Sequence, residues 1–516
     1  MQDSTTAFKS ILFDPRGPEP GDPTIAAPVF FRDLNLDQIV DAVTVGRDEY
    51  DLKILFYTRP GHIDHIRYRQ EIMHDLENPL LFEPIKSFVT ALRNTRRLAI
   101  ASRTRRYQYQ REGCFLDATE IYCRAITTLQ SDLRSVTVQS RGLSSFRDYL
   151  ERYVQSADFI GLTREVESLR KVLSAIRYSV LLEDGKVTVR NYASEIDYSE
   201  VVAAAFAKFK QGAVKDYRVK LVNSLTMNHI EARILDRVAL LNPEAFAALN
   251  NFYQAHQNFA DGIITTFERE VQFYLAWLEY EEKFRRAGLT FCHPQISSVS
   301  KAVSSYNSFD LALAEKLSNR KMPVVCNDFE LRDAERIFVV SGPNQGGKTT
   351  FAHTFGQLHY LANIGCNVPG TEARLFFFDR LFTHFELAED LGTHRGKLQD
   401  DLVRMHQILQ DATPNSVVIM NEIFSATSLR DGIYLGKKIL ERLTELDLLC
   451  VCVTFLDELS SLNRKTVSLV ATIAPENPTH RTYRLERRPA NGLAYAMAIA
   501  EIHHVTYQWI KKRLNA

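Results

Sequence analysis

The sequence predicts two successive regions of different fold class: a mainly α-helical region and, after about residue 320, an α/β domain. Upstream of residue 320, apolar residues recur at three- and four-residue spacing, which predicts amphipathic helices. Downstream, short β-rich apolar runs alternate with amphipathic segments, which is typical of a parallel sheet covered by helices. One of these runs leads directly into the glycine-rich segment Gly342–Thr349.

The amino-acid composition limits which classes of protein the chain can belong to. The 516 residues are 45% hydrophobic and 24% charged, which is typical of a globular chain of several domains. The formal net charge is zero, so any surface that binds nucleic acid must be local. The start has no secretory signal and no apolar run approaches the ~20 residues that span a bilayer. We therefore expect a cytoplasmic protein that does not bind membranes.

Helices are expected in most of the first region. The periodic segments are Leu36–Gly46, Ile63–Asp75, Phe82–Arg97, Cys114–Thr137, Ser144–Tyr153, Leu162–Tyr178, Ser199–Lys210, Pro243–Gln257 and Phe259–Ala287. The last is rich in aromatic residues and should be a long core helix. Between them, Tyr178–Arg190 reads as two strands around Asp184-Gly185, a strong hairpin signal.

Five strands are expected in the second region. They are Arg336–Ser341, Arg374–Phe378, Ser416–Met420, Leu448–Thr454 and Thr482–Leu485. The chain has seven cysteines but no C-x-x-C pair. Cys450 and Cys452 lie inside one apolar run, and we expect them to pack as small hydrophobic residues rather than bind a metal or form a disulfide.

A phosphate-binding loop is predicted where the first of these strands ends, because the segment has the spacing G-x-x-x-x-G-K-T. We define the phosphate loop as residues 342–349. Lys348 should reach the β- and γ-phosphates of a nucleotide, and the Thr349 hydroxyl should face Mg²⁺. The expected ATP-binding residues are Gly342, Pro343, Asn344, Gln345, Gly346, Gly347, Lys348, Thr349 and Thr350.

An acidic residue at the end of a second strand predicts hydrolysis. Glu422 follows the apolar run Ser416–Met420 and would orient the attacking water as the catalytic residue, together with Lys348. Asn421 stands where such strands usually carry Asp, so one charge near Mg²⁺ is missing. Its carbonyl oxygen can still contact the metal through water. We expect an Mg²⁺-dependent ATPase, with slow turnover possible.

Several strings resemble the MutS family of mismatch-repair ATPases. The phosphate loop is similar to the family's G-P-N-M-G-G-K-S/T, and Asn421–Gly432 is similar to D-E-I-G-R-G-T-S-T-Y-D-G. Cys326-Asn327-Asp328 resembles the segment that packs on the nucleotide base, which adds Asn327 to the expected nucleotide contacts. The resemblance is strong after residue 320 and loose before it.

The resemblance implies an ABC-type ATPase that works as a homodimer, with each ATP held between one phosphate loop and a signature element of the other subunit. The implied signature residues are Lys397, Thr427, Ser428 and Asp431. The helical region would form a core and a lever whose hairpin lies where MutS clamps reach DNA. The expected domains are a tail over 1–27, a helical core over 28–105 and 236–318, a clamp-like insertion over 106–235 with its hairpin near 178–190, and the ATPase domain over 319–516.

Departures from the family pattern limit what carries over. The core-like sequence begins near residue 28, so we expect no wedge domain that reads mismatches. Gly396 replaces the serine that reaches the γ-phosphate in trans, although Lys397 supplies a cation. The family's switch histidine falls on Phe455. The chain also ends at Ala516 without the family's helix-turn-helix extension, so dimerisation should depend more on ATP.

Six arginines form the densest basic group, which we call the arginine cluster. They are Arg93, Arg96, Arg97, Arg103, Arg105 and Arg106, and Tyr107 and Tyr109 follow them. This interleaving suits phosphate contacts and base stacking. The alternative is a solvated helix face that pairs with acids elsewhere. His293 has no partner at metal-ligand spacing and is expected to be structural.

Two functions fit these observations. The first is an ATP-gated dimeric clamp that binds duplex or branched DNA in repair or recombination. The second is an ATP-gated scaffold with weak hydrolysis and no direct DNA role, which the missing Asp and the missing histidine favour. The sequence favours the first through its resemblance to MutS.

Overall fold

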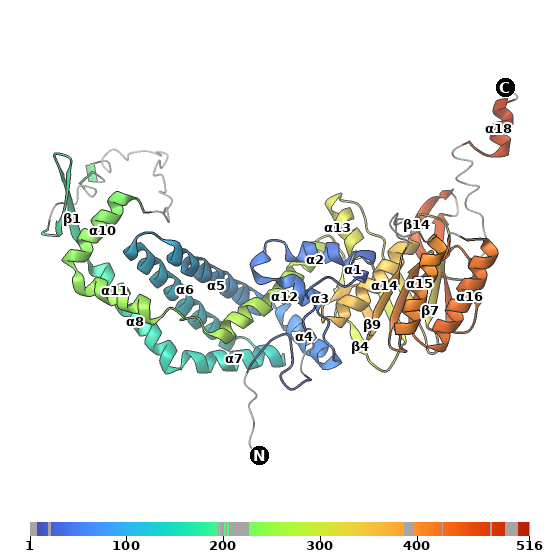
Figure 1. The fold of residues 1–516 in the computed structure, drawn as a ribbon, viewed down its shortest axis with the longest axis horizontal. Coiled ribbons are helices and arrows are strands. Elements are labelled where there is room, and N and C mark those ends of the chain that lie inside the picture. The colour runs from blue at the N-terminus through green and yellow to red at the C-terminus, as the bar shows by residue number, and fades with distance from the viewer. Residues whose placement is uncertain are drawn as a thin grey trace, which may run out of the picture. The chain divides into compact units, whose positions relative to one another are not determined.

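The computed structural model describes residues 8–18, 22–194, 196, 201–202, 204–205, 227–385, 396–425, 427–474, 477–490 and 504–514 (Figure 1). Contacts divide the chain into two compact units. Unit 1 contains Met1–Asn78, Gln139–Ser144 and Arg269–Ala516, and unit 2 contains Pro79–Val138 and Ser145–Glu268. The domain limits expected from the sequence stay a prediction.

Unit 2 is built on long helices. Its elements are α5 (Pro79–Thr104), α6 (Gln108–Ser135), α7 (Arg141–Val154), which begins in unit 1, α8 (Ala157–Ala175), β1 (Tyr178–Glu183), β2 (Lys186–Asn191), α10 (His229–Leu241) and α11 (Pro243–Ala255). Helices α5 and α6 lie side by side, because the three residues between them allow only a tight reversal (Figure 1). The aromatic core includes Phe115, whose ring meets those of Phe252 and Phe259 edge to face.

The expected hairpin is confirmed as the antiparallel pair β1 and β2. Asp184 and Gly185 connect the strands, with φ of 48° and 75°. Two consecutive left-handed residues form the turn that matches the twist of a two-stranded ribbon, which is why Asp-Gly is favoured there. The helix expected over Ser199–Lys210 lies mostly outside the described residues.

The helical part of unit 1 is assembled from distant segments. Its elements are α1 (Phe30–Asp33), α2 (Leu36–Thr44), η1 (Asp48–Tyr50), α3 (Leu52–Tyr57), α4 (Ile63–Leu76), α12 (Gly262–Arg285), which begins in unit 2, and α13 (Leu311–Asn319). Phe273 and Trp277 of α12 are fully buried and pack on Phe56 of α3. The prediction of a long core helix is therefore confirmed.

The main sheet has the strand order β10-β11-β12-β7-β13-β14, and only β14 is antiparallel to its neighbour. Its strands are β7 (Ile337–Ser341), β10 (Leu381–His384), β11 (Val417–Asn421), β12 (Leu449–Val453), β13 (Thr466–Ala474) and β14 (Asn477–Arg487). All five parallel strands end at the same edge, where ligands bind in open α/β sheets. The sequence analysis did not predict β10 or β13.

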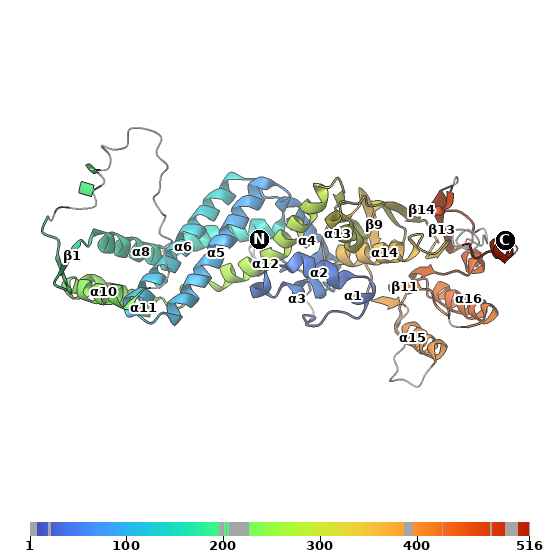
Figure 2. The same ribbon diagram turned by 90° about the horizontal axis from the view of Figure 1, so that it is seen from above.

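Helices cover both faces of the sheet. One face packs against α14 (Lys348–Asn363), where the Phe338 ring meets Phe351 and Phe355. The other face carries Val418 and Cys452, and packs against α15 (Lys397–Asp411), α16 (Leu429–Glu445) and η2 (Asp457–Ser461). Figure 2 shows α14 and the α15–α16 pair on opposite sides of β11. Cys450 and Cys452 are buried in this core, which confirms that they pack as small hydrophobic residues.

A second sheet lies beside the main one in unit 1. It has the order β4-β9-β5-β6, with β4 (Gln295–Ser297), β5 (Val303–Ser308), β6 (Asn327–Leu331) and β9 (Glu372–Phe376). The strand expected over Arg374–Phe378 is β9, so it pairs here and not in the main sheet. The remaining elements are the short pair β3 (Phe291–Cys292) and β8 (Val368–Pro369), and α18 (Tyr507–Leu514). No helix in the described part of the chain is long and apolar enough to cross a membrane.

Candidate nucleotide-binding site

The phosphate loop connects β7 to α14 at the carboxyl edge of the main sheet. Three of its residues have left-handed backbone conformations: Gly342 (φ 115°), Gln345 (φ 59°) and Gly347 (φ 96°). Helix α14 begins at Lys348, directly after Gly347. The first turn of a helix leaves backbone N–H groups without helical partners, and its dipole favours anions. The loop is therefore shaped as an anion cradle.

Close approaches require glycine at two loop positions, and at Gly342 the positive φ requires it as well. A Cβ on Gly342 would lie 3.0 Å from the backbone nitrogen and oxygen of Ala471 in β13. A Cβ on Gly346 would lie 2.9 Å from the Pro343 carbonyl oxygen. Atoms at these distances clash, so β13 and the loop itself hold the cradle in one shape.

Lys348 is almost completely buried beneath the loop. Its ammonium donates to the carbonyl oxygens of Gly342 and Pro343 at 2.9 and 3.3 Å, and approaches Asn344 Oδ1 at 3.5 Å. Burial lowers the pKa of Lys348 to about 8, against the raising effect of the Glu422 and Asp457 charges. A cation is thus held at the loop in an environment that favours an additional anionic partner.

Thr349 at the start of α14 and Asn421 at the end of β11 are brought together. The Thr349 hydroxyl donates to Asn421 Oδ1 at 3.0 Å, which links the start of α14 to the end of β11. Strand β12 lies between β7 and β11, so this contact crosses the end of β12. Hydroxyl and amide oxygens suit Mg²⁺, which keeps several waters and takes few protein ligands. The two oxygens fit the magnesium site expected from the sequence.

Glu422 follows directly after β11 and is half-buried. Its backbone N–H donates to the Val453 carbonyl at 2.9 Å, and its φ is 57°. This left-handed conformation turns the chain out of the strand. The negative charge of Glu422 acts on the pKa of Lys348, so both groups belong to the same local field.

Phe455 covers Lys348 from the end of β12. The Lys348 ammonium lies 4.1 Å from the centroid of the Phe455 ring, within range of a cation–π interaction. The side chain is 48% exposed, so the ring is only partly held by its neighbours. The sequence analysis noted only that Phe455 stands where the family has its switch histidine. It did not predict that the Phe455 ring lies against Lys348.

Strand β14 also reaches the loop, which the sequence analysis missed. Arg481 Nε donates to the Asn344 carbonyl at 3.2 Å, and the Tyr483 backbone lies beside Gly347. Asn327, expected near the nucleotide base, donates to the Tyr483 carbonyl at 2.9 Å and accepts from Leu485 N–H at 2.8 Å. Its side chain anchors β14 beside the loop.

The residues expected in a signature element begin two helices. Ser428 caps α16, and its hydroxyl donates to Asp431 Oδ2 at 2.7 Å while it accepts from Asp431 N–H at 3.2 Å. Both side chains are exposed, and Thr427 is half-buried. Lys397 is the first residue of α15, after Gly396. Much of the preceding segment, including His394 and Arg395, lies outside the described residues.

The arginine cluster is in unit 2, at the end of α5 and in the connection to α6. Arg93, Arg97, Arg103 and Arg106 are exposed. Arg96 instead pairs with Glu268, which is 5% exposed, at 2.5 Å. Arg105 is half-buried, and its Nε is buried with no hydrogen-bond partner among the described residues. The six residues therefore do not form one uniform surface.

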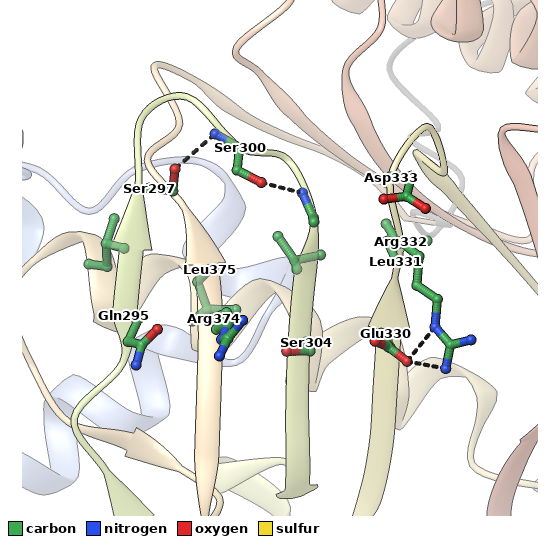
Figure 3. A pocket seen from close by; sticks show the side chains of 13 residues that line it. Gln295, Ser297, Ser300, Ser304, Glu330, Leu331, Arg332, Asp333, Arg374 and Leu375 are labelled. Carbon is green, nitrogen blue, oxygen red and sulfur yellow. Dashed lines mark hydrogen bonds and ion pairs between the residues drawn. The ribbon is translucent and has the colours of Figure 1, made fainter.

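A pocket of about 470 Å³ lies on the second sheet, and its lining contains none of the predicted site residues (Figure 3). Its lining includes Gln295, Ser304 and Arg374. Glu330 and Arg332 also line it, but they bond each other at 2.7 Å. Among the described residues that line it, none belongs to the phosphate loop or to the end of β11.

Comparison with known proteins identifies the α/β region. Residues 338–513 match the family model of MutS domain V. The DNA mismatch repair protein MSH3 of Eremothecium gossypii is 28% identical over 200 residues, which are 39% of this chain and 18% of that protein. The DNA mismatch repair protein MutS of Halalkalibacterium halodurans is 36% identical over 117 residues, covering 23% of this chain and 14% of that protein.

A third relative shows the same extent of similarity. The DNA mismatch repair protein MutS of Orientia tsutsugamushi strain Ikeda is 31% identical over 180 residues, covering 35% of this chain and 20% of that protein. The matches thus span about a fifth or less of the curated relatives. MutS domain V is an ABC-type ATPase domain, and its match begins inside β7, directly before the phosphate loop. The C-terminal part of this chain therefore belongs to the MutS domain V family and is homologous to the MutS and MSH3 mismatch-repair proteins.

Proposed function

We propose that this protein binds and hydrolyses ATP, binds DNA, and acts as an ATP-gated dimeric clamp in DNA repair or recombination. The observation that carries the proposal is the meeting of Lys348, Thr349 and Asn421 at the carboxyl edge of a MutS-type α/β domain. MutS-family proteins bind DNA and dimerise, which supports the proposed partners.

In this proposal the chain's own groups position the nucleotide. Lys348 exchanges the loop carbonyls for β- and γ-phosphate oxygens, which are stronger acceptors for an ammonium. Thr349 and Asn421 hold Mg²⁺, which supplies positive charge to the phosphates when bound. Glu422 orients the attacking water from the end of β11.

The signature residues complete the site of the partner subunit in this proposal. Ser428 and Asp431 form an exposed bonded pair at the start of α16, where hydroxyl and N–H groups can meet phosphate. Thr427 and Lys397 would add a hydroxyl and a cation. Mixing Lys348→Ala subunits with Asp431→Ala subunits tests this arrangement. Recovery of ATPase activity is expected in the mixture, while two inactive variants that stay inactive together would exclude sharing in trans.

A turnover assay tests the proposal as a whole. Steady-state ATP hydrolysis is measured with Mg²⁺ at low salt, alone and with homoduplex, mismatched duplex and four-way-junction DNA. We expect at least one DNA to change the rate, since a clamp couples nucleotide turnover to its DNA. Glu422→Gln protein, prepared identically, controls for a contaminating ATPase. Turnover that no DNA changes would remove the DNA role.

One observation supports a second candidate, an ATP-gated scaffold with weak hydrolysis. Asn421, which accepts the hydrogen bond from Thr349, carries no negative charge where an Asp would. The Phe455 ring lies against the ammonium group of Lys348. The missing charge at Asn421 would slow hydrolysis, and a ring on the Lys348 ammonium competes with a bound phosphate. Under this candidate, ATP drives dimerisation equally with and without DNA, as sedimentation measures. A DNA-dependent dimer would count against it.

A further inference from the structure

Three side chains that could bind a metal ion meet in unit 1, away from the phosphate loop. His74 lies in the last turn of α4, and Glu77 follows three residues later at the end of that helix. His293 lies between β3 and β4, 219 residues after His74. Figure 1 shows α4 in the N-terminal part of unit 1. The sequence analysis found no partner for His293, because its neighbours in space are remote along the chain.

One atom from each residue faces the same point. His74 Nδ1 lies 3.3 Å from His293 Nε2, and His293 Nε2 lies 2.9 Å from Glu77 Oε2. The third side of this triangle, between His74 Nδ1 and Glu77 Oε2, is 3.8 Å. Neighbouring ligands of a tetrahedral ion with bonds of about 2.0–2.1 Å lie about 3.3 Å apart. The three separations scatter around this value.

Hydrogen bonds alone leave this triangle poorly satisfied. If His293 Nε2 carries a proton, it can donate fully to the Glu77 carboxylate or to the His74 nitrogen, but not to both. The tautomer of His74 then decides whether its contact with His293 is a hydrogen bond. A cation at the centre satisfies all three lone pairs at once, and two imidazoles with one carboxylate are a known zinc donor set.

An outer layer of polar groups fixes the carboxylate. Glu77 Oε1 accepts from Asn367 Nδ2 at 3.1 Å and from Arg285 Nη2 at 3.3 Å, which leaves Oε2 for the histidines. Asn367 and Arg285 in turn contact Glu281, whose side chain is 1% exposed. Partners of this kind orient metal-binding carboxylates and raise affinity. A chance surface contact would not require such a built support.

We propose that His74, Glu77 and His293 form a binding site for a Zn²⁺-class transition metal ion. The fourth position is open to water, since the His74 side chain is 65% exposed. The bound ion connects the end of α4, where the chain leaves unit 1, to the β3–β4 connection. Mg²⁺ does not compete, because it prefers oxygen ligands in octahedral geometry. This inference is independent of the proposed ATPase function.

The test is calorimetric titration of the full-length protein, stripped of metal and free of nucleotide, with ZnCl₂ in the presence of excess MgCl₂. The wild type is expected to bind one Zn²⁺ more per chain than His74→Ala or His293→Ala. Asn367→Ala should keep the site but weaken it by about 10- to 100-fold. A second readout is thermal unfolding, where Zn²⁺ should raise the midpoint for the wild type only, because a ligand that binds the folded state stabilises it.

Matched variants separate this site from other zinc-binding groups. His406→Ala removes an exposed histidine of α15 and should bind as the wild type does. Cys292→Ser tests the neighbouring thiol, and it too should leave the affinity unchanged. Equal stoichiometry and affinity in the wild type and both histidine variants would overturn the proposal, as would loss of the site in Cys292→Ser.

Discussion

The phosphate loop and the arginine cluster are both candidate anion-binding regions, but they are built differently. The loop has a fixed backbone, with left-handed residues and glycines that Ala471 and Pro343 confine. Its cation, Lys348, is buried and held by carbonyl oxygens. The arginine cluster consists of long side chains on a helix end, four of which are exposed and one of which already pairs with a buried acid.

Because of this difference, anion binding can be predicted from the local sequence for the loop but not for the arginine cluster. When the backbone of a loop binds the ligand, the sequence motif predicts the shape of the loop. This is because the glycines and the lysine determine the conformation of residues within a few positions. A cluster of arginines in a sequence predicts only positive charge. Whether each arginine can bind an anion or is neutralised by an acidic residue depends on its neighbours in the fold. Glu268 lies 172 residues from Arg96, so no local pattern reveals their pairing.

The largest expected effect is on the rate of ATP hydrolysis, and it tests whether Glu422 acts on the nucleotide that the loop binds. Glu422→Gln should lower the ATPase rate by about 10²- to 10⁴-fold, the usual contribution of a positioned acid–base group. Nucleotide affinity should stay the same, since the amide has the shape of the carboxylate. Steady-state turnover and fluorescent-nucleotide titration separate the two quantities. Glu458→Gln, an exposed residue of η2, is the matched control, and unchanged hydrolysis in Glu422→Gln would reject the assignment.

The next effect is on binding itself. Lys348→Ala should weaken ATP binding by roughly 10- to 150-fold, the value of a charged hydrogen bond of about 1.5–3 kcal/mol. The measurement is equilibrium titration with a fluorescent nucleotide. Lys438→Ala removes a lysine of α16 that pairs with Glu441, and should bind normally. If both variants bind ATP as the wild type does, the nucleotide does not occupy this loop.

The arginine cluster divides into two classes that one experiment can separate. Replacing the four exposed arginines (Arg93, Arg97, Arg103 and Arg106) by Gln should weaken DNA binding for all sequences alike. It should also reduce the slope of log K against log salt by about 0.9 for each DNA phosphate that the variant no longer neutralises. Arg96→Gln should leave that slope unchanged but destabilise unit 2, because the buried Glu268 carboxylate loses its ion pair with Arg96.

Salt-dependent DNA binding and thermal unfolding give the two readouts for the arginine variants. A quadruple variant whose salt slope equals that of the wild type would mean that the exposed arginines are only a solvated helix face. An Arg96→Gln variant whose salt slope falls as it does in the quadruple variant would show that the distinction between Arg96 and the four exposed arginines is wrong.

The smallest effect concerns pH. Burial lowers the pKa of Lys348 to about 8 from its ordinary 10.5, so the unliganded lysine loses its proton above about pH 8. Bound phosphate favours the ammonium, and binding above that pH must therefore take up a proton. ATP affinity should be constant below about pH 8 and weaken toward tenfold per pH unit above it. Titrations from about pH 7 to about pH 9.5 check this, and a flat profile would place the lysine in a less buried setting.

Long periodic helices were predictable, and several strands were not, including the nine-residue strand β13. Helix α4 begins at Ile63, where the sequence analysis starts it, because its apolar period is undisturbed. Strand β9 was found but its partners were not, since pairing is a tertiary property. Strand β10 is only four residues long, and β6 alternates polar and apolar residues without a distinctive turn signal.

The candidate site was predictable in its local parts. The phosphate loop, Thr349, Asn421 and Glu422 stand at strand ends that the sequence marks. Phe455 could have been suspected from its position at the end of β12, had the strand order been known. Asn327 was expected near the nucleotide only through the resemblance to MutS, and its hydrogen bond to β14 was not expected. Arg481 could not have been placed, because its contact with Asn344 joins residues 137 positions apart.

The sequence by itself determined the helical and α/β regions, the hairpin at Asp184-Gly185, and the phosphate loop. Each of these rests on spacing or on backbone freedom within a few residues. Only the tertiary structure decided that Phe455 covers Lys348, that Arg96 pairs with Glu268, and that His293 meets His74. The physical reason is that these contacts join side chains that are far apart in the chain, and only packing brings such groups within a few ångströms of each other.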